Sequence, residues 1–183
     1  DIYELKDKRT ATTKHFRLED GSFYVAQYNT DIHYLDENGE YQDIDNSLSA
    51  SGSEISTRNA KIKFAKKTTG NNNIFTLHDG NRKLTLSLDD ANKNIEGIIF
   101  NNETEFGDDT TQLQKMTTLD KISASVLYED ILANTDLEYV INGLNIKENI
   151  IVKDKADNYA YSFTMQLNNL TAELSEKGSI YIS

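Results

Sequence analysis

The feature that most constrains this chain is an alternation of apolar and polar residues, interrupted at short intervals by turns. Residues 159–167 alternate at every position, the runs 61–65 and 84–88 do the same, and residues 121–128 read as a further strand. A period of two places successive side chains on opposite faces of a β-strand. Only the stretch 110–119 is compatible with a helix, and with a short one. The pattern therefore indicates an all-β protein.

Glycine-centred turns separate the alternating runs. Asp20-Gly21, Asn38-Gly39 and Asn142-Gly143 are each flanked by strand-like segments, as in β-hairpins. At Asn38-Gly39 we expect a two-residue turn with both residues at positive φ, and Tyr34 and Tyr41 able to pair across the strands. About a dozen short strands follow one another in this way. Their spacing predicts an antiparallel β-sandwich with little or no helix.

The strands on either side of each loop lack partners of their own, so we expect a single domain over residues 1–183. Residues 47–53 are small and polar and are expected to form a loop. Residues 101–118 are acidic and rich in threonine, as in a long mobile insertion. The chain starts at Asp1 and ends within an expected strand, which suggests a domain excised from a larger surface protein.

The overall charge is strongly acidic. The chain has 30 Asp and Glu residues against 19 Lys and Arg, a formal net charge of -11. Such a surface repels phosphate backbones and anionic membranes, so we expect no nucleic-acid partner. No apolar run reaches the ~20 residues of a transmembrane helix, so membrane insertion is not expected either. Cysteine is absent, which excludes disulfides and thiolate chemistry.

Acidic residues supply the candidates for a metal site. Asp36, Asp43 and Asp45 surround the second turn, and Asp108 and Asp109 lie in the acidic loop. The order of side-chain oxygens does not match a calcium-binding EF-hand loop, and a hairpin turn explains the first group better. We therefore predict no catalytic, cofactor or metal residues, with calcium at these five carboxylates as the open alternative.

Tyrosine is the commonest aromatic residue, with 10 copies. Tyr159 and Tyr161 are two residues apart in one expected strand and so share a face. Such a pair could stack on a sugar ring, although half-buried strand tyrosines are the simpler interpretation. No nucleophile elbow, phosphate-binding loop or dinucleotide-binding glycine pattern is present.

Several segments resemble the N-terminal region of very large secreted bacterial proteins that carry DNRLRE domains and RHS (YD) repeats. These segments are KHFRLEDG (14–21), HYLDENGEYQDIDN (33–46), KIKFA (61–65), YEDILANTDLEYV (128–140) and IKENIIV (146–152). The resemblance covers about residues 14–182 and is weakest over 101–118.

This resemblance implies a β domain ahead of adhesive or toxin-delivery repeats, in an extracellular, secreted or cell-wall-associated protein. From it we expect a non-catalytic structural or adhesion module and not an enzyme. Its expected partners are neighbouring domains of the parent chain and a glycan or a host or bacterial surface. A carbohydrate-binding module is the first alternative. A glycan-processing enzyme is the second, and it would need two carboxyl groups facing each other across a cleft.

Overall fold

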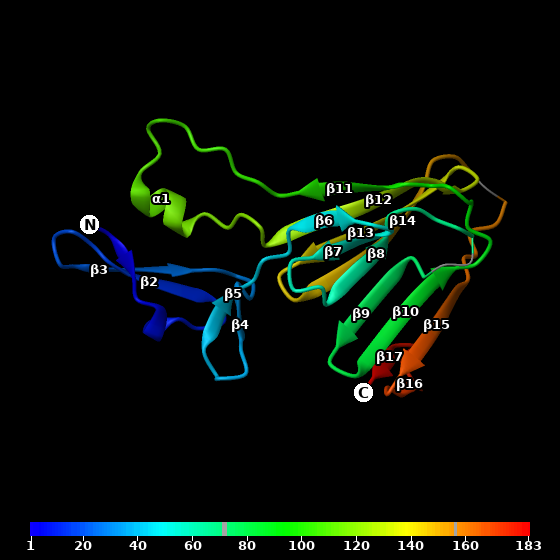
Figure 1. The fold of residues 1–183 in the computed structure, drawn as a ribbon, viewed down its shortest axis with the longest axis horizontal. Coiled ribbons are helices and arrows are strands. Elements are labelled where there is room, and N and C mark those ends of the chain that lie inside the picture. Colours follow the sequence, from blue (N-terminus) through cyan, green and yellow to red (C-terminus); the bar gives the residue numbers. More distant parts are fainter. Residues whose placement is uncertain (71–72, 156) are drawn as a thin grey trace. The chain divides into compact units, whose positions relative to one another are not determined.

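Antiparallel strands make up most of the regular structure (Figure 1). The computed structural model describes residues 1–70, 73–155 and 157–183, and within them it has seventeen strands, one α-helix and one short 3-10 helix. The expected all-β, antiparallel sandwich is confirmed. No helix in the described part of the chain is long and apolar enough to cross a membrane.

The chain folds into two compact units, each assembled from three stretches of sequence. Unit 1 comprises Asp1–Ser47, Phe100–Ser125 and Val140–Lys147. Unit 2 comprises Leu48–Ile99, Val126–Tyr139 and Glu148–Ser183. The single domain expected over 1–183 stays a prediction, because whether the two units unfold together is a matter for experiment.

Unit 1 contains a small sheet, a hairpin and the helix. The sheet has the order β1 (Tyr3–Glu4), β2 (Thr13–Arg17), β3 (Phe23–Gln27), and the hairpin pairs β4 (His33–Leu35) with β5 (Tyr41–Asp43). The 3-10 helix is η1 (Lys6–Lys8), and α1 spans Gln112–Thr117. Ile32, Ile44 and Ile122 form its apolar cluster, with Tyr28 and Leu119 packed against them.

Helix α1 lies in the segment that the sequence suggested was a mobile insertion. It begins with a capping box, in which the Thr111 side chain accepts from the Gln114 N–H and the Gln114 side chain accepts from the Thr111 N–H. This reciprocal pair satisfies two of the amide donors left open at a helix start. The sequence allowed a short helix within 110–119, and α1 lies there. The mobility expected for residues 101–118 stays a prediction.

The hairpin turn at Asn38-Gly39 differs from the expected one. Gly39 has a φ of +78° whereas Asn38 is not in the positive-φ region. The Gly39 N–H donates to the Asp36 carbonyl at 3.0 Å, and the Asp36 N–H to the Glu40 carbonyl at 2.9 Å. This is the pattern of a three-residue loop, a type I turn closed by a left-handed glycine. The same hydrogen-bond pattern recurs at residues 18–22 and 175–179.

The extra loop residue shifts the pairing of the strands. Leu35 lies opposite Tyr41, and Tyr34 opposite Gln42. The expected cross-strand pair of Tyr34 and Tyr41 is therefore wrong: each tyrosine lies opposite the residue next to the other one, and the two side chains are on opposite faces of the hairpin.

Unit 2 is built on a six-stranded antiparallel sheet. Its order is β15 (Phe163–Asn168), β10 (Arg82–Leu88), β9 (Phe75–Asp79), β8 (Ile62–Ala65), β7 (Glu54–Thr57), β6 (Leu48–Ser51). A four-stranded sheet has the order β11 (Gly97–Asn101), β12 (Ser123–Leu132), β13 (Thr135–Asn142), β14 (Asn145–Val152), and the boundary between the units falls within its strands. A last hairpin pairs β16 (Ala172–Leu174) with β17 (Ile180–Ile182).

One face of the six-stranded sheet carries the core of unit 2. Phe64 and Phe75 lie opposite each other in adjacent strands, with ring centroids 5.7 Å apart. Tyr139 of β13 stacks on Phe75 at 5.4 Å and lies 5.4 Å from Phe64. The buried Tyr128 hydroxyl donates to the Ala65 carbonyl at 2.6 Å. These contacts join β12 and β13 to the sheet.

Gly97 marks a point where this core leaves no room for a side chain. A Cβ there would lie 2.9 Å from Ile55 Cδ1, 3.0 Å from Val126 Cγ1 and 3.2 Å from Tyr128 Cε1. We expect Gly97→Ala to lower the free energy of unfolding by about 1–3 kcal/mol through overpacking. Urea denaturation measures this. Adding Val126→Ala should restore part of the loss, and an unchanged or higher stability of Gly97→Ala alone would contradict the prediction.

Two strand boundaries differ from the sequence-based expectation. Residues 47–53, expected as a loop, contain β6 and the turn into β7, where Ser51 lies opposite Glu54. Leu48 and Ile55 are buried, and this burial holds both strands in the sheet. The strand expected from residue 159 begins only at Phe163.

Candidate functional site

The second face of the six-stranded sheet is polar. One cross-strand row runs through β8, β9, β10 and β15, and it consists of Lys63, Thr76, Thr85 and Gln166. The next row joins His78 of β9, Lys83 of β10 and Asn168 of β15. Because paired residues of adjacent strands share a face, these side chains lie on the side opposite Phe64 and Phe75.

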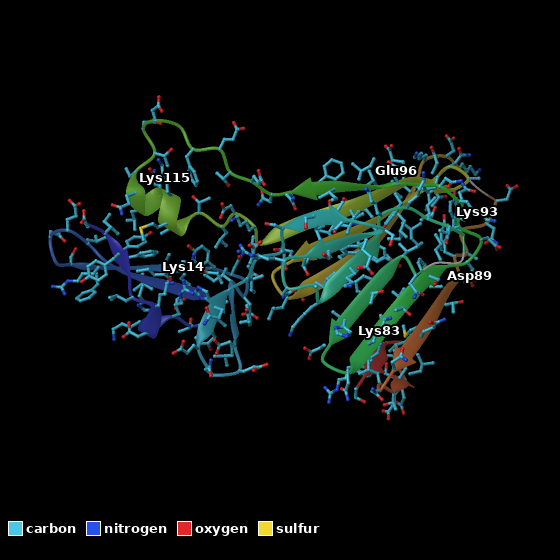
Figure 2. All side chains as sticks on the ribbon, in the orientation of Figure 1. Lys14, Lys83, Asp89, Lys93, Glu96 and Lys115 are labelled. Atoms are coloured by element: carbon cyan, nitrogen blue, oxygen red, sulfur yellow. The ribbon has the colours of Figure 1, made fainter. Side chains whose placement is uncertain are left out.

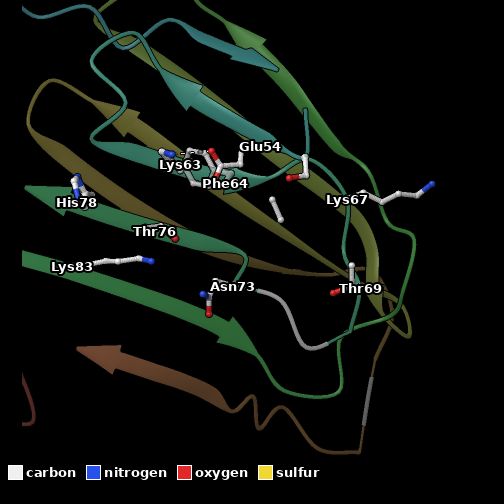
Figure 3. A pocket seen from close by; sticks show the side chains of 11 residues that line it. Glu54, Lys63, Phe64, Lys67, Thr69, Asn73, Thr76, His78 and Lys83 are labelled. Atoms are coloured by element: carbon white, nitrogen blue, oxygen red, sulfur yellow. Dashed lines mark hydrogen bonds and ion pairs between the residues drawn. The ribbon is translucent and has the colours of Figure 1, made fainter. Parts of the chain in front are cut away.

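A hollow of about 570 Å³ lies on this face. We call it the basic groove, and its polar lining is Glu54, Lys63, Lys67, Asn73, Thr76, His78 and Lys83, with Ser53 and Thr69 at its margin (Figure 3). Its volume is within the range of ligand-binding pockets, ~300–1,000 Å³. Unlike most such pockets it presents ammonium groups and hydrogen-bond donors, so it suits an anionic ligand.

The lysines of the groove differ in their pairing. Lys63 Nζ lies 2.8 Å from a Glu54 carboxylate oxygen, and Lys67 Nζ lies 3.7 Å from Glu96. Lys83 makes no ion pair with any residue that the structure describes. Lys83 lies on β10 (Figure 2). It projects toward Asn73, whereas Lys67 points out of the hollow (Figure 3). Lys83 is thus the cation most available to a ligand.

The floor of the groove offers no phenyl, phenol or indole ring for stacking. Phe64 lines it, but its side chain is 2% exposed and packs against Phe75 and Tyr139. Recognition here would rest on charge and on the hydroxyl, amide and imidazole groups of Thr76, Asn73 and His78. Such groups bind phosphate and hydroxyl oxygens, whereas stacking on bases or sugar rings needs an accessible aromatic ring.

Most of the groove's lining comes from a basic stretch of the sequence, although Ser53 and the acidic Glu54 precede it. Residues 58–83 contain seven Lys and Arg residues and one acidic residue, Asp79, a formal local charge of +6. The net charge of -11 conceals this local positive charge. A count of charged residues in successive windows along the sequence would have located the basic stretch.

A second group of charged side chains is buried in unit 1. Arg9 Nε donates to Glu4 at 2.7 Å, and its Nη2 donates to Glu4 at 2.9 Å and to Asp43 at 3.1 Å. Arg9 Nη1 donates to the Tyr41 carbonyl at 3.2 Å, and Lys14 Nζ lies 3.6 Å from Asp43. The Arg9 side chain is only 3% exposed. This cluster therefore fastens β5 to the start of the chain, and Asp43 is its exposed member, with 54% of its side chain accessible.

His33 belongs to the same cluster. Its Nδ1 lies 2.7 Å from the Thr10 carbonyl, and its Nε2 lies 3.4 Å from Asp43 without a hydrogen bond to the described residues. Burial is the largest influence and lowers the pKa of His33 below its ordinary value, assisted by the positive charges of Arg9 and Lys14 and opposed by Asp43 and the Thr10 bond. The imidazole is therefore held neutral in the folded chain.

This gives a pH-dependent stability with a defined sign. Since the folded pKa is lowered, the unfolded chain binds the extra proton as pH falls below about 6.5. We expect the free energy of unfolding to fall between about pH 7 and pH 5, by at most ~1.4 kcal/mol per pH unit. Urea titrations across this range measure it. The slope should be smaller in His33→Gln, and equal slopes in both proteins would contradict the prediction.

The calcium candidates have protein partners. Asp36 accepts from the Glu40 N–H, the Gln42 side chain and the Asn38 N–H, and these bonds lower its pKa. Burial alone would raise the pKa of Asp43, but Lys14 and Arg9 hold it below its ordinary value. These contacts favour the ionised form of both carboxylates.

The other three candidates lie in turns or loops. Asp45 accepts from the Ser47 N–H at 3.1 Å, and Asp108 and Asp109 are exposed in the turn before α1. No three His, Asp or Glu side chains among the described residues are grouped so that they could hold a metal ion. Calcium binding at any of these carboxylates stays a prediction.

The expected tyrosine pair is not on a strand. Tyr159 and Tyr161 precede β15, so no pleated backbone places them on one face. Tyr159 is exposed and Tyr161 is half-buried. The strand placement that the alternation suggested is therefore wrong, and ligand binding at these two tyrosines stays a prediction.

Comparison with known proteins gives three related matches. The chain is 29% identical to the tRNA3(Ser)-specific nuclease WapA of Bacillus spizizenii over 98% of its own length. It is 28% identical to the tRNA(Glu)-specific nuclease WapA of Bacillus subtilis subsp. natto and to the tRNA nuclease WapA of Bacillus subtilis, again over 98% of its length. The chain spans about 7% of the length of each of these relatives. No family model and no solved structure matches.

These matches overturn the functional expectation drawn from the sequence. A non-catalytic adhesion module, a carbohydrate-binding module and a glycan-processing enzyme were expected in that order, with no enzyme activity and no nucleic-acid partner. The relatives are nucleases named for tRNA, so these expectations are wrong. The expectation of no nucleic-acid partner was based on the net charge of the whole chain. That sum conceals the basic stretch 58–83.

Proposed function

We propose that the protein to which this chain belongs is a nuclease that acts on tRNA. The observation that carries the proposal is the match over nearly the whole chain to three proteins named as tRNA nucleases. A match of this extent, at similar identity to all three, favours a segment that such nucleases share. The all-β fold and the basic groove are compatible with a part of an enzyme that handles RNA.

We further propose that the chain is a β-rich segment from the N-terminal region of a large secreted protein with RHS (YD) repeats. The resemblance of residues 33–46 and 128–140 to that region supports this placement. The small share of the relatives' length that the chain covers is compatible with one segment among many. Secretion of the parent protein is part of the same proposal.

The test is cleavage of tRNA by the parent protein. Purified parent protein is incubated with unfractionated tRNA, and the products are resolved on a denaturing gel. We expect discrete tRNA fragments, which a 5S ribosomal RNA control should not yield. A parent protein that leaves tRNA intact, under conditions where a WapA nuclease cleaves it, would overturn the proposal.

A further inference from the structure

We propose that the basic groove of unit 2 binds the phosphodiester backbone of RNA, with Lys83 and Lys63 as its principal phosphate contacts. The inference rests on the proposed tRNA nuclease and adds a substrate-contacting surface within this chain. It starts from the polar face of β8, β9 and β10, where two cross-strand rows present lysine, threonine and histidine side chains.

Charge is the first support. The lining of the groove carries Lys63, Lys67 and Lys83 against Glu54, a formal charge of +2 in a chain whose formal net charge is -11. The acidic surfaces elsewhere repel a polyanion, so a nucleic acid that approaches unit 2 is directed toward this groove. Lys83 has no ion-pair partner among the described residues and is open to a phosphate without loss of an existing contact.

The chemistry of the lining is the second support. Lys63, Lys83 and His78 can face phosphate oxygens, and Thr76 and Asn73 offer groups that bond phosphate or ribose hydroxyls. The Phe64 ring is buried, which leaves the small imidazole of His78 as the ring that the groove presents. A site with several charges and donors and no large aromatic ring favours the backbone over the bases.

The relatives supply the third support. The chain is about equally similar to a nuclease named for tRNA3(Ser) and one named for tRNA(Glu). A segment shared by enzymes of different named specificity has no reason to read the identity of a tRNA. Contacts to the backbone, which every tRNA presents, are what such a segment can provide.

Glu54 sets the strength of the site. Its carboxylate holds Lys63 Nζ at 2.8 Å and would repel a neighbouring phosphate. Removing its charge should free Lys63 and strengthen RNA binding. Charge changes at Glu54 and at Lys83 are therefore expected to act in opposite directions, a signature that general misfolding would not produce.

The experiment measures binding of fluorescently labelled tRNA to the 183-residue chain by anisotropy at several salt concentrations. We expect Lys83→Glu to weaken binding on the order of 10-fold and to reduce the salt slope by about 1, as for a lost phosphate contact. Glu54→Gln should tighten binding a few-fold. Lys177→Glu is the control, because it makes the same charge change in the exposed turn between β16 and β17, outside the groove. It should alter binding less than about 2-fold, since salt screens charges that are far from the bound RNA. Circular dichroism confirms that each variant is folded.

The outcomes separate the two proposals. Equal losses in Lys83→Glu and Lys177→Glu, or no tRNA binding at all, would overturn the groove. So would a strong preference between a serine and a glutamate tRNA, because a backbone site binds both alike. If the groove fails while the parent protein cleaves tRNA, the proposed function stands without it. If the groove binds tRNA but the parent protein does not cleave it, the nuclease proposal fails alone.

Discussion

Replacing Arg9 with alanine is expected to lower the free energy of unfolding of unit 1 by about 3–5 kcal/mol, the cost of breaking a buried ion pair by removing one partner. The guanidinium makes a two-fold contact with Glu4 and a further bond to Asp43 in a site where its side chain is 3% exposed. Without it, the Glu4 carboxylate is left with little solvent and no counter-charge. Urea denaturation followed by tyrosine fluorescence measures the change.

Two variants show whether geometry or charge matters in this cluster. Arg9→Lys keeps the charge but cannot make the two-fold contact with Glu4, so it should restore less than half of the lost stability. Glu4→Gln on the Arg9→Ala background removes the uncompensated carboxylate and should recover part of the loss. A cost below about 1 kcal/mol for Arg9→Ala would place this cluster with ordinary surface ion pairs and contradict the prediction.

Replacing Phe64 with alanine is expected to destabilise unit 2 by about 3–5 kcal/mol, the usual cost of truncating a buried aromatic side chain. Phe64 contacts both Phe75 and Tyr139, with ring centroids 5.7 and 5.4 Å away, so the change removes one of the three rings of the aromatic cluster. Phe64→Leu keeps most of the apolar volume and should cost roughly 1–2 kcal/mol. Equal effects of the two variants in urea denaturation would contradict a packing origin.

The Arg9 and Phe64 variants together test whether the chain is one domain, since each acts within one unit. Amide hydrogen exchange reports on strands of both units at once. If 1–183 is one cooperative domain, Arg9→Ala should reduce protection in β9 and β10 as well as in β2. Loss of protection confined to the unit that carries the substitution would show two domains.

The class of fold could be predicted because alternation and turn glycines are local signals. Gly39 marks a real hairpin, but the sequence could not distinguish a two-residue from a three-residue loop, since glycine serves both. The hairpin of β6 and β7 was missed because serines dominate it. The burial of Leu48 and Ile55 holds this hairpin in the sheet. That burial depends on pairing with the neighbouring strand β8, so the hairpin's own sequence does not reveal it.

The candidate groove could be predicted only in part. A charge window over residues 58–83 would have located a basic region. Lys63 and Lys83 share a face because of the register in which β9 pairs with β8 on one side and with β10 on the other. No local sequence pattern specifies that register. At Tyr159 and Tyr161 the sequence predicted too much strand. The apolar–polar alternation begins at residue 159, whereas β15 begins only at Phe163.

Both units are made of three separated stretches of sequence, and this determines when the chain can fold during synthesis. Hairpins such as β4–β5 can form within microseconds of leaving the ribosome. Unit 1 lacks its last stretch until residue 147 has been made, and the β10–β15 ladder, which pairs Leu84 with Leu167, waits longer still. At ~5–20 residues per second the nascent chain therefore stays open for seconds. A product truncated before residue 147 would contain hairpins but neither finished unit, and we expect proteases to remove it.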